Sequence, residues 1–156
     1  MLLATPSVAI VQSEIILKKL MDVTADCVKC AFERLNGGDS KLGERINEQH
    51  TAILRMEDNL RVYLLKLIEC DLSDAQAKEV SEMLNRSDDC VHIAEHCLKI
   101  RDTAEDMSSR NKGLTMAGKR EFEVLSKALL TLMNTAAEGS NAKDKRADAK
   151  IEPLYF

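Results

Sequence analysis

Aromatic residues are scarce in this chain of 156 residues, where they amount to 3% of the sequence, and tryptophan is absent. Glycine and proline are also few, with six and two residues respectively. Sheets favour aromatic and β-branched side chains and need frequent turns, so this composition argues against a β protein. The abundant leucine, alanine, glutamate and lysine favour long helices instead. We therefore expect an all-α fold in a chain of single-domain size.

A strong excess of charge of one sign is absent as well. Charged residues make up 31% of the chain, but the formal net charge is only −4. This balance provides no uniform field that would hold nucleic acid, so no nucleic-acid partner is expected. Apolar runs extend over only a few residues, as at Ile15–Leu17, whereas a membrane helix needs about 20. The N-terminus lacks the basic region and long apolar stretch of a secretory signal.

The cysteines number five, an odd count, and they lie inside helical patterns. A disulfide framework is therefore not expected, and free thiols in a reducing compartment are. Cys27 and Cys30 match the C-x-x-C spacing of redox and zinc sites, but neither a second pair nor a thioredoxin-type strand accompanies them. Both fall on an apolar seam, which favours the interpretation as small buried hydrophobic residues. The same interpretation applies to Cys70, Cys90 and Cys97.

Apolar residues recur with the helical period in the first half of the chain. A first helix is predicted over residues 6–36, with Thr5 as its cap, Pro6 at the first helical position and Gly37 just beyond its end. Its apolar stripe consists of Ile16, Leu17, Leu20, Met21, Val23, Cys27, Val28, Cys30 and Leu35. A second helix is predicted over residues 40–69. Its seam is formed by Ile46, Ile53, Leu60 and Leu67, widened by Leu42, Met56, Tyr63 and Leu64.

The second half of the chain predicts two further helices. Ser73 and Gln76 have the spacing of a capping box, and a third helix follows over residues 74–107. Its seam contains several small residues and consists of Val80, Met83, Ser87, Cys90, Ala94 and Cys97. After a polar loop at residues 108–113, a shorter fourth helix ends near Gly139. Its apolar residues are Phe122, Leu125, Leu129, Leu132 and Ala136.

Short links between long helices force neighbouring helices to run antiparallel. The expected architecture is therefore an antiparallel up-and-down bundle over residues 1–140. Residues 141–156 are charged and low in hydrophobicity, which predicts either a C-terminal tail or the beginning of a further helix.

The most informative polar residues lie on the third helix. His92, Glu95 and His96 spell H-x-x-E-H, a zinc-protease motif in which two histidines hold zinc and the glutamate activates water. Such an enzyme needs a further carboxylate ligand and a substrate-binding sheet, and the chain has no strand pattern. We therefore assign no catalytic residue and do not expect an enzyme.

A metal site without catalysis remains an alternative. On a helical wheel, Asp88, His92, Glu95 and Lys99 share one flank, with His96 about 40° further round. Asp88, His92, Glu95 and His96 could hold a divalent transition metal or iron, although an ordinary hydrated face has the same pattern. The D-x-x-x-D pair on the first helix would add oxygen ligands if it met that flank, and otherwise is an ordinary exposed face. That pair is Asp22 and Asp26.

Several segments together resemble one known family. They are Ala4-Thr-Pro-Ser-Val-Ala9 leading to Ser13-Glu-Ile, Asn47-Glu-Gln, Leu60-Arg-Val-Tyr-Leu-Leu-Lys-Leu67, Leu72-Ser-Asp, and Asp88-Asp-Cys-Val-His-Ile-Ala-Glu-His96. In this order they resemble the PhoU-like cytoplasmic domain of bacterial sodium/phosphate cotransporters over about residues 3–138. The resemblance implies a three-helix repeat plus a fourth helix that would open a second repeat. The segment Ala149-Lys-Ile-Glu-Pro-Leu154 is similar to the beginning of that repeat's next helix.

The resemblance also has implications for the site and the function. The family's metal motif, E-x-x-x-D, aligns with Val91 and Glu95, so only its second acidic position is kept, as glutamate. The implied function is a non-catalytic regulatory or interaction domain at the cytoplasmic face of a transporter. The implied partners are the transporter's membrane domain or a phosphate-signalling protein, and self-association is expected because part of a double repeat is missing. The alternatives are a metal-binding bundle and a helical adaptor unrelated to phosphate.

Overall fold

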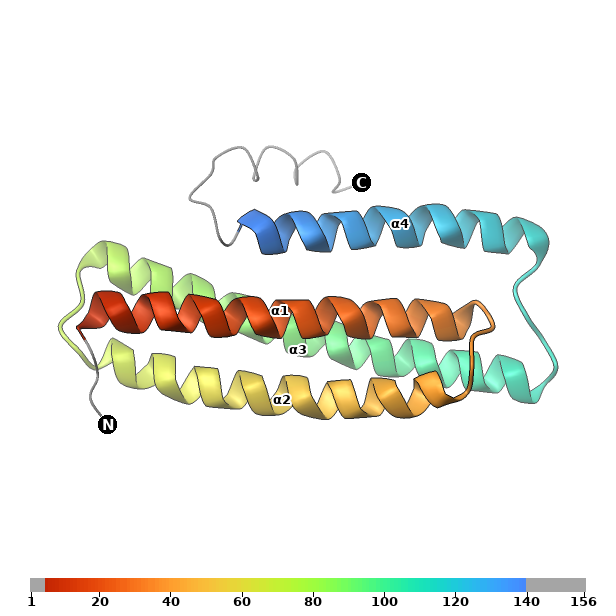
Figure 1. The fold of residues 1–156 in the computed structure, drawn as a ribbon, viewed down its shortest axis with the longest axis horizontal. Coiled ribbons are helices and arrows are strands. Elements are labelled where there is room, and N and C mark those ends of the chain that lie inside the picture. The colour runs from red at the N-terminus through yellow and green to blue at the C-terminus, as the bar shows by residue number, and fades with distance from the viewer. Residues whose placement is uncertain (1–4, 140–156) are drawn as a thin grey trace.

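The computed structural model describes residues 5–139, and these form four helices joined by short loops. The helices are α1 (Pro6–Leu35), α2 (Lys41–Ile68), α3 (Asp74–Ser109) and α4 (Met116–Gly139). They run up and down in alternation along one long axis (Figure 1), which confirms the predicted all-α antiparallel bundle. The first four residues and the charged segment 141–156, with its predicted tail or further helix, lie outside the described residues.

The signals at the helix ends are mostly confirmed. The Ser73 hydroxyl accepts a hydrogen bond from the backbone N–H of Gln76, and the Gln76 side-chain oxygen accepts one from the backbone N–H of Ser73, so the capping box is present. Gly37 has φ +94° in the turn after α1, a conformation that favours glycine. Thr5 occupies the cap position of α1, but its side chain makes no capping hydrogen bond, so that part of the prediction is wrong.

The end of α3 lies two residues beyond the prediction, at Ser109. Arg110 explains the extra half turn. Its backbone N–H donates to the carbonyl of Asp106 at 3.2 Å, and its guanidinium Nε lies 3.0 Å from the Asp106 carboxylate. Local polar contacts can thus prolong a helix into residues whose composition predicts a loop.

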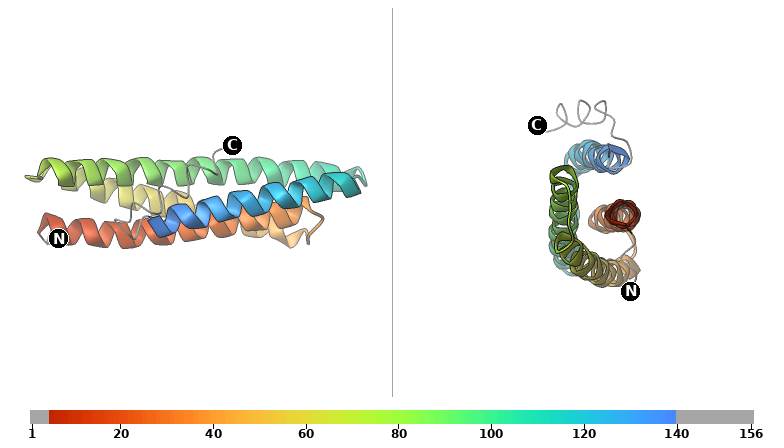
Figure 2. Two further views of the ribbon diagram at one scale, coloured as in Figure 1. Left: turned by 90° about the horizontal axis from the view of Figure 1, so that it is seen from above. Right: turned by 90° about the vertical axis from the view of Figure 1, so that its left-hand side faces the viewer.

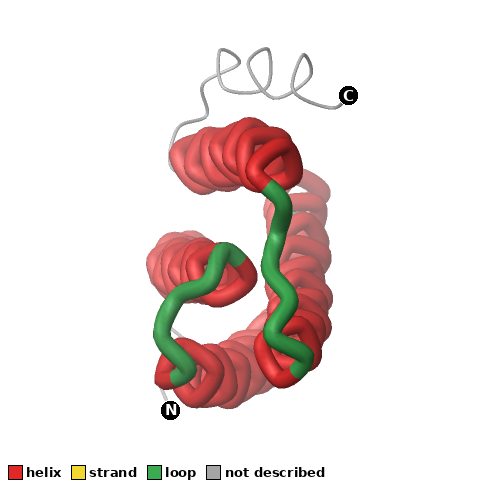
Figure 3. The backbone as a smooth tube through the Cα atoms, turned by 90° about the vertical axis from the view of Figure 1, so that its right-hand side faces the viewer, coloured by secondary structure: helices red, strands yellow, loops and turns green. Residues whose placement is uncertain are grey.

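Helix α1 is the central element of the bundle. It packs against α2, α3 and α4, whereas α2 and α4 lie on different sides of it (Figures 2 and 3). Because the helices alternate in direction, α1 and α3 run parallel, and α4 runs antiparallel to α1. The contact of α4 is mainly with α1, so α4 is the least enclosed of the four helices. Residues on α4 therefore pack mainly against one neighbouring helix.

The core follows the predicted seams of α2 and α3. Ile46, Ile53, Leu60 and Leu67 are buried on α2, as are Val80, Met83, Ser87, Cys90, Ala94 and Cys97 on α3. From α1, the core receives Ala9, Ile10, Leu17, Leu20, Cys27, Val28, Cys30 and Ala31. The buried residues of the α3 seam from Ser87 to Cys97 have small side chains, and this allows the parallel helices α1 and α3 to approach closely.

Two predictions about packing faces are wrong. Ile16 was assigned to the stripe of α1, but its side chain is 40% exposed. On α4, Leu125 and Leu129 were assigned to the core-facing seam, yet they are 64% and 37% exposed. The side of α4 that meets the bundle is rotated from the predicted seam and carries Phe122, Ser126, Leu130, Met133 and Ala137. With α1 as its main neighbour, α4 can bury only one narrow side.

The described residues contain no strand, in agreement with the composition. Among the helices of residues 5–139, none has the combination of length and apolarity that a bilayer span requires. This agrees with the expectation from the short apolar runs.

Candidate functional site

The predicted site residues of α3 lie on an exposed flank of the bundle. The Nε2 atom of His92 lies 3.4 Å from Oδ2 of Asp88, and its Nδ1 atom lies 3.6 Å from Oε2 of Glu95. The spacings i, i+4 and i+7 bring these three side chains together, as the helical wheel predicts. Each of the three side chains is about half exposed. His96 is exposed too, and it forms no hydrogen bond or ion pair with this group.

Two residues of α2 extend this group across the helix interface. The guanidinium of Arg61 donates to Oδ1 of Asp88 at 3.1 Å and to Oε1 of Glu57 at 2.6 Å. Glu57 is buried, and its hydrogen bond with Arg61 raises the pKa of the arginine. We call the series Glu57, Arg61, Asp88, His92 and Glu95 the ionic chain. It links α2 to α3, and its charges alternate where the histidine is protonated.

Glu57 and Arg61 are not among the site residues that the sequence predicts. Their i, i+4 spacing on α2 is a signal for an ion pair within one helix, but no local pattern indicates which residue of α3 lies opposite. The contact between Arg61 and Asp88 depends on the offset between two helices, which only the three-dimensional packing provides. The ionic chain is thus partly local and partly a product of the fold.

The geometry of the ionic chain differs from that of a metal centre. Metal ligands direct their donor atoms at one common point, whereas both ring nitrogens of His92 face carboxylates and Asp88 faces Arg61. Within residues 5–139, no group of three or more His, Cys, Asp or Glu side chains is arranged to hold a metal ion. Metal binding by Asp88, His92, Glu95 and His96 therefore stays a prediction that needs these side chains to rearrange.

Elemental analysis tests that prediction. If the site exists, protein purified without chelators and then dialysed against zinc or iron retains about one equivalent of metal at micromolar protein. A variant with both His92→Ala and Glu95→Ala loses the metal but keeps its thermal stability to within about 0.5 kcal/mol, because both side chains are exposed. Equal metal content in the parent protein and the variant would rule the site out.

The carboxylate of Asp26 faces α2, and that of Asp22 pairs within α1, so neither contacts the polar flank of α3. Oδ2 of Asp26 accepts hydrogen bonds from Arg45 at 2.9 Å and from Gln49 at 2.5 Å, whereas Asp22 lies 3.5 Å from Lys18 of its own helix. The condition under which this pair would have added metal ligands is therefore not met. Asp26 instead joins α1 to α2.

All five cysteines are free thiols, and four of them lie in the core as predicted, whereas the prediction of a buried Cys70 is wrong. Cys27, Cys30, Cys90 and Cys97 are buried, and Cys70 is partly exposed. A hydrogen bond with Cys97, together with burial, raises the pKa of the Cys27 thiol, and burial raises the pKa of Cys30 and of Cys90. Buried neutral thiols are poor nucleophiles and poor metal ligands. The interpretation of the C-x-x-C pair as small hydrophobic residues is confirmed.

A second candidate surface is apolar and lies on α4. Leu125 and Leu129 are one turn apart and lie beside the packed side of α4, which carries Leu130 and Met133. We call the exposed residues Leu125 and Leu129 the α4 flank. Large exposed apolar side chains gathered on one element are typical of an interaction surface rather than of a catalytic site.

Comparison with known proteins identifies no relative of this chain. No protein family, no curated protein and no solved structure matches the chain.

Proposed function

We propose that this chain is a non-catalytic helical interaction module that regulates sodium-dependent phosphate transport. The observation that carries the interaction part is the α4 flank, where Leu125 is 64% exposed on a helix that packs mainly on α1. The phosphate part rests on the sequence resemblance to PhoU-like domains. With it comes the proposal that the module acts at the inner face of a membrane, beside the transporter's membrane domain or a signalling protein.

We further propose that the α4 flank binds a second copy of the same chain. Leu125 and Leu129 are separated by four residues, so two antiparallel copies of α4 related by a two-fold axis would place leucine against leucine. Such an isologous contact needs no other protein with a matching groove. Burying one leucine side chain contributes about 1.5–3 kcal/mol, and a symmetric contact buries the same leucine in both copies of the chain.

A double variant with Leu125→Glu and Leu129→Glu tests this proposal with two measurements. We expect sedimentation velocity to give a dimer for the parent protein and a monomer for the variant at equal concentration. The loss of buried apolar area and the repulsion between the new carboxylates weaken association by at least about tenfold. In cells that express the whole gene, the same variant is expected to change the uptake of labelled phosphate in sodium medium but not the uptake of a labelled amino acid.

The matched control adds the same two charges on another side of α4, at the exposed positions Thr131 and Asn134. This Thr131→Glu, Asn134→Glu variant should associate and transport as the parent does. A monomeric parent protein over the micromolar range would contradict the self-association. Normal phosphate uptake by the monomeric Leu125→Glu, Leu129→Glu variant would contradict the link to transport, and circular dichroism shows whether each variant keeps its helices.

A further inference from the structure

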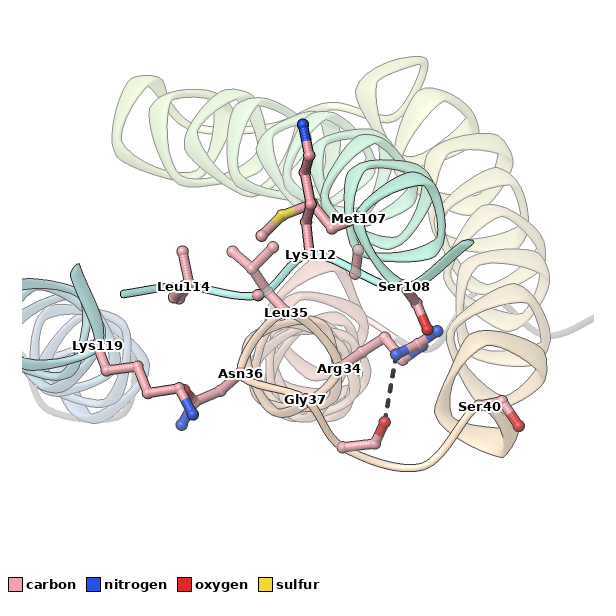
Figure 4. Close-up of a pocket in the computed structure, with 13 residues that line it drawn as sticks. Arg34, Leu35, Asn36, Gly37, Ser40, Met107, Ser108, Lys112, Leu114 and Lys119 are labelled. Atoms are coloured by element: carbon pink, nitrogen blue, oxygen red, sulfur yellow. Dashed lines mark hydrogen bonds between the residues drawn. The ribbon is translucent and has the colours of Figure 1, made fainter. Parts of the chain in front are cut away.

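A cavity of about 220 Å³ lies at the end of the bundle where α1 leads to α2 and α3 leads to α4. It is formed by the last turn of α1, the turn around Gly37, the end of α3 and the loop before α4 (Figure 4). Sites for drug-sized ligands measure roughly 300–1,000 Å³. This cavity is therefore suited to a small ion or a compact molecule rather than to a large cofactor.

The lining of the cavity is basic. Arg34, Lys112 and Lys119 contribute to it, and none of the 13 lining residues is acidic. Arg34 comes from α1, Lys112 from the loop after α3 and Lys119 from the first turn of α4. In Figure 4 the Lys119 side chain extends from α4 toward Asn36 at the end of α1. Both lysines are exposed, and their flexible stems allow the ammonium groups to reorient toward a ligand.

Arg34 is the unusual residue of this cavity, because its side chain is buried and unpaired. It is only 7% exposed, and within residues 5–139 no carboxylate lies at ion-pair distance from it. Its Nη1 atom donates to the carbonyl of Gly38 at 3.2 Å, whereas its Nε–H has no hydrogen-bond partner. In Figure 4 the guanidinium reaches from α1 toward Ser108 on α3.

A buried guanidinium without a counter-charge is unfavourable, and a buried N–H without an acceptor adds to that cost. An anion in the cavity would supply the missing counter-charge. The planar fork of an arginine matches two oxygens of a tetrahedral oxyanion, and lysines supply further charge without demanding one geometry. Three positive charges against no negative one favour a doubly charged ligand over a single carboxylate.

We infer that this cavity is a binding site for a phosphoryl group, held by the Arg34 guanidinium and assisted by Lys119 and Lys112. The ligand is inorganic phosphate or the phosphate of a small monoester. This inference goes beyond the proposed function and does not depend on it, because it rests on Arg34 and on the end of the bundle opposite the α2–α3 turn. A different origin for Arg34 is its position in the last turn of α1, where a cation also offsets the helix dipole.

Titration calorimetry and thermal unfolding distinguish binding of a phosphoryl group by Arg34 from a role of Arg34 at the helix end alone. The probes are inorganic phosphate and glycerol phosphate, each against potassium chloride at equal ionic strength so that screening is constant. We expect saturable binding and a rise in melting temperature of about 3 °C at a tenfold excess over Kd. Arg34→Met is expected to weaken binding by at least about tenfold, since a charge-assisted hydrogen bond is lost. Binding of both probes indicates recognition of the phosphoryl group alone, and binding of glycerol phosphate alone indicates a monoester ligand.

Two further variants keep the test decisive if Arg34→Met does not fold. Lys119→Met removes an exposed charge at the cavity and is expected to weaken binding about threefold. Lys78→Met removes an exposed charge from the opposite end of the bundle and should bind as the parent does. The inference is overturned if the parent shows no saturable binding at about 10 mM of either probe, or if Lys119→Met and Lys78→Met bind equally. Unchanged binding by folded Arg34→Met would likewise assign the arginine to the helix end alone.

Discussion

A Leu64→Ala variant is expected to unfold about 6–12 °C below the parent protein, whereas Leu65→Ala unfolds within about 2 °C of it. The two leucines are neighbours on α2 and differ only in the direction of their side chains. Leu64 is fully buried in the core shared with α1 and α3, and Leu65 is 50% exposed. Truncating Leu64 removes its buried methyl groups and leaves a cavity, at a cost of about 3 kcal/mol.

Differential scanning calorimetry measures both variants under the same conditions. The Leu65→Ala change controls for helix propensity, because both substitutions introduce the same residue into the interior of the same helix. Similar losses for the two variants would mean that the side of α2 assigned to the core is wrong. A large loss for Leu65→Ala alone would place that side chain in an interface, and association measured on the same sample would then identify it.

The second large effect is expected from Ala94→Leu, which adds volume where α3 meets α1. Ala94 is fully buried between Cys90 and Cys97 on the α3 seam. The side chains of these two cysteines contact Thr24 and Cys27 of α1, so Ala94 occupies the intervening turn of the same interface. A leucine has no space there unless the two helices separate, and overpacking of this kind costs about 2–3 kcal/mol.

Urea unfolding gives the free energy for Ala94→Leu and for its control, Ala77→Leu. Ala77 lies on α3 as well, but its side chain is exposed, so its replacement should change stability by less than about 0.5 kcal/mol. A stable Ala94→Leu variant would show that α1 and α3 are not in close contact at this level. In that case the small residues of the seam would have no packing role.

The sequence predicts the inner parts of the bundle better than its periphery. Ile46, Ile53, Leu60 and Leu67 recur every seven residues, and all four are buried because α2 faces both α1 and α3. A helix with two large neighbours buries a wide stripe, so the position of the stripe's centre is recovered easily from the periodicity. The capping box at Ser73 is equally local, which is why it too could be predicted.

The wrong predictions concern residues whose burial or contacts depend on a neighbouring helix, which the local sequence pattern does not indicate. On α4, Leu125 and Leu129 continue an apolar pattern, but the pattern does not indicate that α1 is the main neighbour of this helix. Packing against α1 therefore determines which of two apolar sides of α4 is buried. At the candidate sites, the grouping of Asp88, His92 and Glu95 follows from helical geometry, whereas the contact of Asp88 with Arg61 requires the offset between α2 and α3.

Arg34 illustrates the same limit. A single arginine near the end of an apolar stripe is most simply interpreted as a solvated charge at a helix end. Its burial results from the turn at Gly37 and Gly38, which brings a backbone carbonyl to the guanidinium, and from the loop after α3, which closes over the same region. The loop after α3 is distant from Arg34 in the sequence, and helical periodicity does not indicate that the turn after α1 brings the Gly38 carbonyl to its guanidinium.

The position of α4 has a consequence for how the molecule opens. Because α4 is held mainly by α1 and buries few side chains completely, while α1, α2 and α3 enclose one another, the cooperative units of the fold are unequal. Regions with little buried apolar contact open at a lower free energy than the core, and their amide hydrogens exchange sooner. The amides of α4 should therefore lose protection as one unit, while the three-helix core stays closed. Partners that bind α4 would then act on the helix that, within residues 5–139, leaves the bundle at the lowest cost to the three-helix core.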